Sequence, residues 1–377
     1  MLRALQVWPH QGVPENAAAW LFRVAHNAAI DAIRRRQVLG DKTEAIVAEL
    51  LRPVMFAPGD PDVEEQLRDD ELRMIFMCCD PALTRDASVA LSLKTVGGFS
   101  VREIARAFLA DEAAIAQRLV RAKRQIREQH LTLEMPHGRE LSRRLDSVLE
   151  VLYFLFNEGY AAHEGDDLVR QDLCVEALRL GLLVAASSIA EPRVHALVAL
   201  MAFEAARLPA RVDEAGDLVL LDDQDRSRWD ARLIGLGFHH LERSMAGDNV
   251  SEYHVQAAIA ATHARAADGR STDWPLILEM YDRLLAINAS PVVALNRAVA
   301  VAKVRGAEEA LESLERLKQD PRLRDYHLLL AVRGHLLTEL GRPQEAAASF
   351  RAALECACSE PERRFLKRRL EECETEA

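Results

Sequence analysis

Aromatic residues, long apolar runs and cysteine motifs are all scarce in this sequence of 377 residues. No apolar segment reaches the roughly 20 residues of a membrane-spanning helix, and no signal peptide opens the chain. The six cysteines follow no zinc-binding spacing, and no pair of histidines completes a ligand set. We therefore expect a cytoplasmic protein with reduced thiols, no metal and no contact with a membrane.

Patterns that carry catalysis or bind a cofactor are missing as well. Gly97 and Gly98 break a helix rather than form a phosphate-binding loop, and no Ser-His-Asp set can be assembled. Four histidines lie on several segments without the spacing of metal ligands: His239, His240, His254 and His263. We expect neither a cofactor nor an enzymatic activity.

Helix-forming residues are abundant, and charge is unevenly distributed. Ala, Leu, Glu and Arg dominate, which predicts an all-α fold. Residues 1–130 hold 18 basic and 18 acidic residues, so the net charge of −11 falls entirely on residues 131–377. An acidic chain binds nucleic acid weakly unless it has a specific site. Any contact with DNA is therefore predicted within the N-terminal third.

The chain is organised around residues 97–128, whose pattern predicts a helix-turn-helix. Ser100 and Glu103 have the spacing of a capping box at the start of the first helix. A short turn ends at Asp111, which is placed to cap the second helix. The second helix directs four apolar residues inward: Ile115, Leu119, Ala122 and Ile126.

This second helix has the residue types of a helix that enters the major groove of DNA. Its first turns are small enough to approach base edges, and its later turns carry cations suited to phosphates. The alternative is a solvated basic face on an ordinary helix pair; the coincidence of turn, caps and charge favours DNA. The predicted contacts are Ala114, Gln117, Arg118, Arg121, Lys123, Arg124 and Arg127.

A second basic helix is predicted over residues 16–36. Its basic end either complements the helix dipole or contacts phosphate or single-stranded nucleic acid, and the segment alone does not decide between them. Residues 38–66 contain several prolines and predict a linker. Residues 67–80 and 84–95 predict two helices that brace the helix-turn-helix.

The rest of the chain predicts a helical extension. Helices are expected over residues 172–183 and 192–206, and Gly159 is placed just past the end of an earlier helix. Arg211–Leu221 alternates weakly, which predicts a small β-hairpin. The charged loop at Asp222–Arg228 is interpreted as caps and ion pairs at a packed corner. A carboxylate active site or metal site is the alternative, disfavoured because no His or Cys lies nearby.

Residues 272–377 carry a weak internal repeat. Arg305–Ala310 recurs as Gly341–Ala346, with an offset of 36 residues between Glu309 and Glu345. Paired helices at this period are typical of a tetratricopeptide (TPR)-like solenoid, and a plain helical bundle is the alternative.

Several stretches resemble the extracytoplasmic-function sigma factors of bacterial RNA polymerase. Trp20–Arg36 is similar to their helix that reads the −10 element, and residues 67–130 are similar to region 4, which reads the −35 element. The long C-terminal extension of one subgroup, which ends in TPR-like repeats, is matched at Asn157–Tyr160, Leu221–Trp229 and Ser290–Val301. The resemblance covers nearly the whole chain, and its long motifs are specific.

This resemblance implies a transcription initiation factor that brings core RNA polymerase to promoter DNA. Its parts would be partial region 2 (1–37), a linker (38–66), region 4 (67–130), a helical extension (131–271) and TPR-like repeats (272–377). Near the −10 element, where a single-stranded base is captured, the implied contacts are Arg23, Asn27, Arg34, Arg35 and Arg36. The extension is expected to regulate, alone or with a protein that binds it. The alternative is a TPR-type interaction scaffold whose sigma remnant does not initiate.

The resemblance also places two further helices before residue 1, one of which docks on the polymerase clamp. Only Leu2–Trp8 corresponds to the end of that helix. We therefore expect the 377-residue chain to bind core polymerase weakly, and an upstream extension of the reading frame to restore binding.

Overall fold

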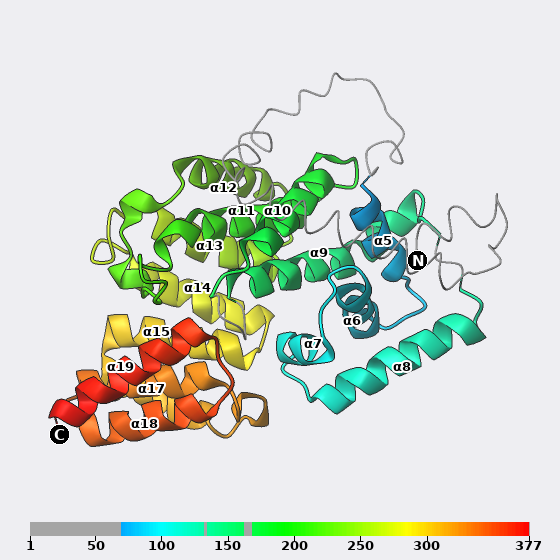
Figure 1. Ribbon diagram of the computed structural model, residues 1–377. Helices are drawn as coiled ribbons and strands as arrows, with labels where there is room; N and C mark the ends of the chain where they lie inside the picture. The colour runs from blue at the N-terminus through cyan, green and yellow to red at the C-terminus, as the bar shows by residue number, and fades with distance from the viewer. Residues whose placement is uncertain (1–68, 132–133, 162–167, 377) are drawn as a thin grey trace. The chain divides into compact units, whose positions relative to one another are not determined.

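The computed structural model describes residues 69–131, 134–161 and 168–376, and within these ranges the fold is all-α, with no β-strand (Figure 1). All of these residues belong to one compact unit, Phe56–Ala377. None of the helices in these ranges combines the length and apolar character that a membrane crossing requires.

Fifteen α-helices follow one another in the described residues. The first four are α5 (Asp70–Cys78), α6 (Arg85–Thr95), α7 (Val101–Ala107) and α8 (Glu112–Glu128). The next five are α9 (Arg139–Tyr160), α10 (Gln171–Ala186), α11 (Pro192–Ala206), α12 (Ala231–Ser244) and α13 (Glu252–Arg265). The last six are α14 (Trp274–Ile287), α15 (Pro291–Arg305), α16 (Ala307–Leu317), α17 (His327–Glu339), α18 (Pro343–Glu355) and α19 (Glu360–Glu376).

The long helix α9 joins the N-terminal helices to the extension. It packs against α5 and α6 and also against α10 and α11. Its buried Arg144 donates to the backbone oxygen of Phe76 at 3.0 Å and pairs with Asp80 at 3.1 Å. Because a buried guanidinium is costly without partners, these bonds hold α9 in one position against α5.

Gly159 lies inside α9, so the prediction that it follows the helix end is wrong. A Cβ at this position would lie 2.7 Å from the backbone nitrogen of Cys174 and 2.9 Å from the backbone oxygen of Arg170. The amide of Arg170 also donates to the Gly159 oxygen at 2.7 Å. Glycine is therefore required by the close approach of α9 to the start of α10, and not by the end of the helix.

The β-hairpin predicted over Arg211–Leu221 is reduced to a single antiparallel bridge between Val212 and Leu218. The Asp213 amide donates to the Asp217 oxygen at 3.0 Å across the turn. Short 3-10 turns at Leu208–Ala210 and Leu221–Asp223 flank the bridge. The prediction of a reversal was correct and that of strands was wrong, because Arg211 has a helical backbone conformation and a 3-10 turn begins at Leu221.

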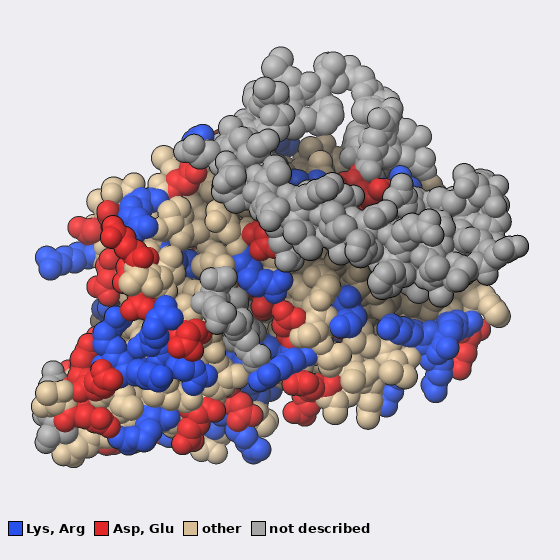
Figure 2. Space-filling model, in the orientation of Figure 1, with Lys and Arg blue, Asp and Glu red and all other residues tan. Residues whose placement is uncertain are grey.

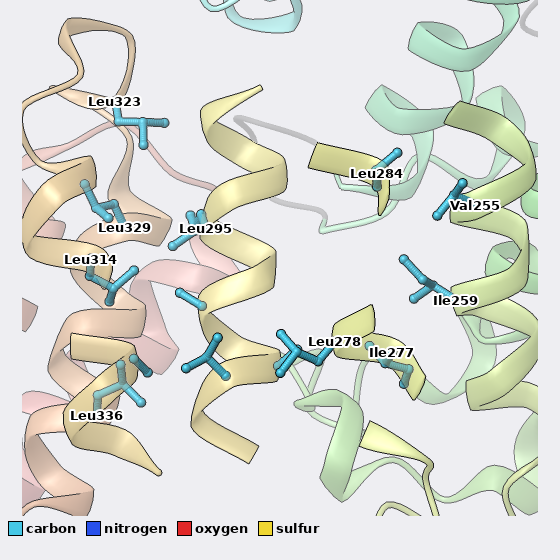
Figure 3. Close-up of a cluster of buried hydrophobic side chains, with 14 residues drawn as sticks. Val255, Ile259, Ile277, Leu278, Leu284, Leu295, Leu314, Leu323, Leu329 and Leu336 are labelled. Atoms are coloured by element: carbon cyan, nitrogen blue, oxygen red, sulfur yellow. The ribbon is translucent and has the colours of Figure 1, made fainter. Parts of the chain in front are cut away.

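The C-terminal helices form successive pairs, and α13–α17 share one apolar core. α15 and α17 begin 36 residues apart, at Pro291 and His327, and α16 and α18 begin 36 residues apart, at Ala307 and Pro343. In Figure 3 the buried leucines of this core run from α14 to α17, with Val255 and Ile259 of α13 at one side. The predicted offset of 36 residues is thus seen in the helix starts.

A second core closes the C-terminal end of the helix array. It includes Phe350 of α18 and Leu366 of α19, each of which is only 1% exposed. The rest of α19 is rich in charge, and its Arg364 pairs with Asp217 at 2.6 Å. The last helix therefore covers an apolar face with one side and presents charged residues with the other.

Two buried histidines join α11 to α12. His195 and His240 face each other with their Nδ1 atoms 2.9 Å apart, so one ring donates a hydrogen bond and the other accepts it. Burial lowers the pKa of His195 to about 4 and that of His240 to about 3, with a smaller contribution from the nearby Arg243. Both rings are therefore neutral in the folded protein at neutral pH.

We expect this pair to make the extension sensitive to acid. The folded pKa values lie below the unfolded value near 6.5, so between these values the unfolded chain binds more protons. Stability is then fully present above pH 6.5 and falls as pH drops toward 4, by up to about 1.4 kcal/mol per pH unit for each histidine. Urea unfolding between pH 7 and 4.5 measures this slope. His240→Gln should flatten it, whereas the same change at the exposed His239 should not; equal slopes in both variants would contradict the assignment.

Candidate DNA-binding surface

The predicted capping box is confirmed at the start of α7. The Ser100 hydroxyl accepts from the Glu103 amide at 3.1 Å, and the Glu103 carboxylate accepts from the Ser100 amide at 2.6 Å. α7 ends at Ala107, with Phe108 as its C-cap, and Leu109 turns the chain with a positive φ of 48°. Asp111 has the backbone conformation of an N-cap but makes no side-chain hydrogen bond to α8. The two helices of the predicted helix-turn-helix are thus present as α7 and α8.

The side of α8 that packs against α6 and α7 is apolar, as predicted. Ile115, Leu119 and Ala122 are buried there, and Ile126 is half-buried. Six of the predicted contact residues lie on the exposed side instead: Ala114, Gln117, Arg121, Lys123, Arg124 and Arg127. The amphipathic pattern of α8 therefore separates a packing side from an exposed, basic side.

Arg118 departs from the other predicted contacts. Its guanidinium carbon lies 5.2 Å from the centre of the Phe108 ring, and its Nη2 lies 3.4 Å from Asp86 of α6. Only 29% of the side chain is exposed. Arg118 therefore braces α8 against the turn and against α6 rather than extending from the exposed side.

The cations of the exposed side are concentrated in the second half of α8. Figure 2 shows Lys and Arg side chains over this part of the helix, whereas its first turns are free of charge except at the very start. Arg124 pairs weakly with Glu128 at 3.6 Å, and both side chains are two-thirds exposed. Exposed pairs of this kind contribute little, so these cations stay available to a polyanion.

Val120 is an exposed residue that the sequence reasoning missed. It is 64% exposed, although it is apolar. It lies three residues after Gln117 and directly before Arg121, so the three residues share the exposed side of the helix. The sequence did contain a signal for this residue, because Val120 is an apolar residue at a position that helical spacing places on the polar side of the helix. A side chain of this kind suits contact with the methyl group of thymine.

Other predicted site residues fall elsewhere. Arg23, Asn27, Arg34, Arg35 and Arg36 lie outside the described residues. In the charged loop, Asp222 pairs with Lys303 at 2.8 Å, and Asp225 accepts from the amide and hydroxyl of Ser227. Among the residues that the structure describes, no three His, Cys, Asp or Glu side chains gather as a metal site would require. The loop thus has the caps and ion pairs of a packed corner.

Comparison with known proteins finds a family match in the extension. Residues 144–245, which run from α9 past the end of α12, match the profile described as "Family of unknown function (DUF6596)". A protein of Rhizobium meliloti (strain 1021), named Uncharacterized protein R00370, is 40% identical over 375 residues, which cover 98% of this chain and 87% of the relative. No solved structure matches the chain.

Proposed function

We propose that this chain, which belongs to the same family as the Rhizobium meliloti protein, is a sigma factor of the extracytoplasmic-function type. The observation that carries the proposal is the exposed side of α8. Along this side small residues come first, Gln117 and Val120 follow, and the cationic residues lie at the end. This order matches what the major groove presents, since base edges lie at its floor and phosphates at its rim. The sequence resemblance to sigma region 4 and to the −10-reading helix supports it.

In this proposal the residues of α8 divide into three roles. Gln117, Val120 and Arg121 contact base edges of the −35 element, and Lys123, Arg124 and Arg127 contact phosphates. Arg118 keeps α8 in place through Phe108 and Asp86. The helices α5–α8 correspond to region 4, and the pairs from α15 to α18 correspond to TPR-like repeats. Core RNA polymerase and promoter DNA are the partners, and no catalytic step belongs to the chain itself.

Substitutions on α8 test this division. Gln117→Ala and Arg121→Ala are each expected to reduce the preference for a matched −35 sequence over a scrambled one by about 1–3 kcal/mol. Arg124→Ala should weaken binding to both sequences equally and reduce the salt slope of the affinity by about one unit. Fluorescence anisotropy at several salt concentrations, on duplexes selected by the chain from random DNA, measures both quantities.

Two controls make this test specific. Arg283→Ala, on the exposed surface of α14, should leave DNA affinity unchanged because its side chain is 71% exposed and lies outside α8. Arg118→Ala should lower the thermal stability of the chain and weaken binding to every sequence together. Identical behaviour of Gln117→Ala, Arg121→Ala and Arg124→Ala on matched and scrambled duplexes would contradict the assignment of roles.

The second candidate is an interaction scaffold whose sigma region does not initiate, and the extended helix array favours it. The two functions separate in a purified transcription assay with core polymerase, the chain and a template that carries the selected −35 sequence. Promoter-specific transcripts support the sigma factor. Folded protein that neither binds the duplex nor associates with core polymerase supports the scaffold.

A further inference from the structure

Three arginines of the extension lie in alternation with two aromatic rings, and we call this set the arginine ladder: Arg211, Tyr160, Arg207, Trp229 and Arg226. The guanidinium carbon of Arg211 lies 3.7 Å from the centre of the Tyr160 ring. That of Arg207 lies 5.9 Å from Tyr160 and 5.5 Å from Trp229, and that of Arg226 lies 5.0 Å from Trp229. The ladder connects the end of α9, the end of α11 and the loop before α12.

The hydrogen bonds of the ladder are incomplete. Arg207 donates to Glu204 at 3.0 Å through Nη1, and Arg226 donates to the backbone oxygens of His263 and Ala266 and to the Thr272 hydroxyl. Arg211, which is 9% exposed, makes no ion pair or side-chain hydrogen bond with another described residue. Its guanidinium is held instead by the face of the Tyr160 ring.

Several buried nitrogen atoms of this region have no hydrogen-bond partner in the described part of the chain. The Nε atoms of Arg207, Arg211 and Arg226 are all buried and unbonded, and so are the Nε1 atom of Trp229 and the Nδ1 atom of His263. Buried polar groups without a partner are rare in folded proteins, so their grouping in one place marks a candidate ligand site. Stacking on a ring occupies the face of a guanidinium and leaves these in-plane N–H groups unused.

The ladder also holds more positive than negative charge. Glu204 is the carboxylate that pairs directly with it, through Arg207. Of the neighbouring carboxylates, Asp222 is taken by Lys303 at 2.8 Å, and the exposed Asp268 accepts from the amide of Ser271. His263 does not offset this excess: burial, and next the charge of Arg207, lower its pKa to about 4, so its ring is neutral at neutral pH. Counting only the residues that the structure describes, two guanidinium charges of the ladder have no paired carboxylate.

We propose that the arginine ladder binds a phosphate-type dianion, either inorganic phosphate or the phosphoryl group of a small molecule. Two unpaired positive charges match a dianion, and guanidinium N–H groups are the donors that bind phosphate oxygens best. The Trp229 indole supplies a further donor. This site gives a role to the charged sequence around Leu221–Trp229, which the proposed contacts with DNA do not use. It lies in the extension, so its occupancy is a signal separate from promoter sequence.

Thermal unfolding of the full chain in inorganic phosphate tests this site. At a concentration one hundred times the dissociation constant, phosphate should raise the melting temperature by about 3–4 °C for a chain of this size. The shift should saturate, and chloride at equal ionic strength should not reproduce it. Phenyl phosphate, a monoester, is the second probe. A larger shift with the monoester identifies a phosphorylated small molecule as the natural ligand, and a larger shift with phosphate identifies the free ion.

Variants of the ladder decide whether any shift comes from this site. Arg211→Gln should abolish the shift, and Arg211→Lys, which keeps the charge, should retain part of it. Arg283→Gln, on the exposed surface of α14, should show the full shift. Broadening of the phosphate ³¹P NMR signal provides a readout that does not depend on the stability of a variant. The absence of a saturable shift and of broadening in the unsubstituted chain, or equal shifts in Arg211→Gln, would show that the ladder is only structural.

Discussion

Gly159→Leu is expected to destabilise the chain by more than about 3 kcal/mol, because it overpacks a position closed by backbone. The added Cβ would lie 2.7 Å from the Cys174 nitrogen and 2.9 Å from the Arg170 oxygen. Neither atom can move alone. The Arg170 amide donates to the backbone oxygen of Gly159, and the backbone oxygen of Arg170 accepts from the Cys174 amide. Relief therefore requires separation of α9 from α10. Urea unfolding followed by circular dichroism should show a large fall in the midpoint.

Gly235 of α12 provides a matched control. It also lies inside a helix, but a Cβ added there meets no atom within 4 Å. Gly235→Ala should therefore stabilise the chain by about 0.5–1 kcal/mol, because alanine loses less backbone entropy in a helix. A midpoint for Gly159→Leu equal to that of the unsubstituted chain would show that α9 and α10 do not approach as described.

Phe350→Asp is expected to unfold the C-terminal end of the helix array, at a cost of at least about 4 kcal/mol. Phe350 is 1% exposed and packs in the core that also contains Ala346, Leu337 and Leu366. The ring also packs closely on Gly334 of α17, because a Cβ added to that glycine would lie 2.7 Å from a carbon of the Phe350 ring. An aspartate there removes the ring and places a charge in an apolar core. Hydrogen exchange should show loss of protection in α17, α18 and α19.

The effect should weaken with distance along the array, since stacked helix pairs contact mainly their neighbours. Helices α5–α8 should keep their protection, although Arg106 of α7 will lose its hydrogen bond to the Ala357 oxygen at 2.9 Å. Leu328→Asp serves as the control, because Leu328 of α17 is 37% exposed and a charge there stays near water. Simultaneous loss of protection in α7–α8 and α17–α19 would show one cooperative unit instead.

Local signals in the sequence predicted the helices well. The helix expected over 192–206 is α11, since Pro192 suits the first turn of a helix. The capping box at Ser100 likewise marks the start of α7. Gly159 was misplaced because a glycine after an apolar helical run suggests a helix end, and sequence does not reveal a neighbouring helix that needs the space. The reversal of the chain within Arg211–Leu221 was predicted, but its flanking 3-10 turns were not.

The exposed side of α8 could be predicted because helical periodicity fixes which residues share a face. What periodicity does not fix is the path of a long side chain. Arg118 lies at the border of the two sides, and Phe108 and Asp86 draw it inward. The arginine ladder was beyond prediction for the same reason, since its members come from three separated segments of the sequence and are brought together only by the packing of α9, α11 and the loop before α12.

The charged outer side of α19 bears on how copies of this protein behave toward one another. In an array of stacked helix pairs, the last pair has an apolar face like those that pack between neighbouring pairs. If this face is uncovered, it can bind the first helix pair of a second molecule. Contacts of that head-to-tail type do not close and generate filaments. Here α13 lies against the first helices of the array, and α19 covers the last pair with Leu366 and Cys373. The array is therefore terminated at both ends by its own chain, which favours dispersed molecules over polymerisation.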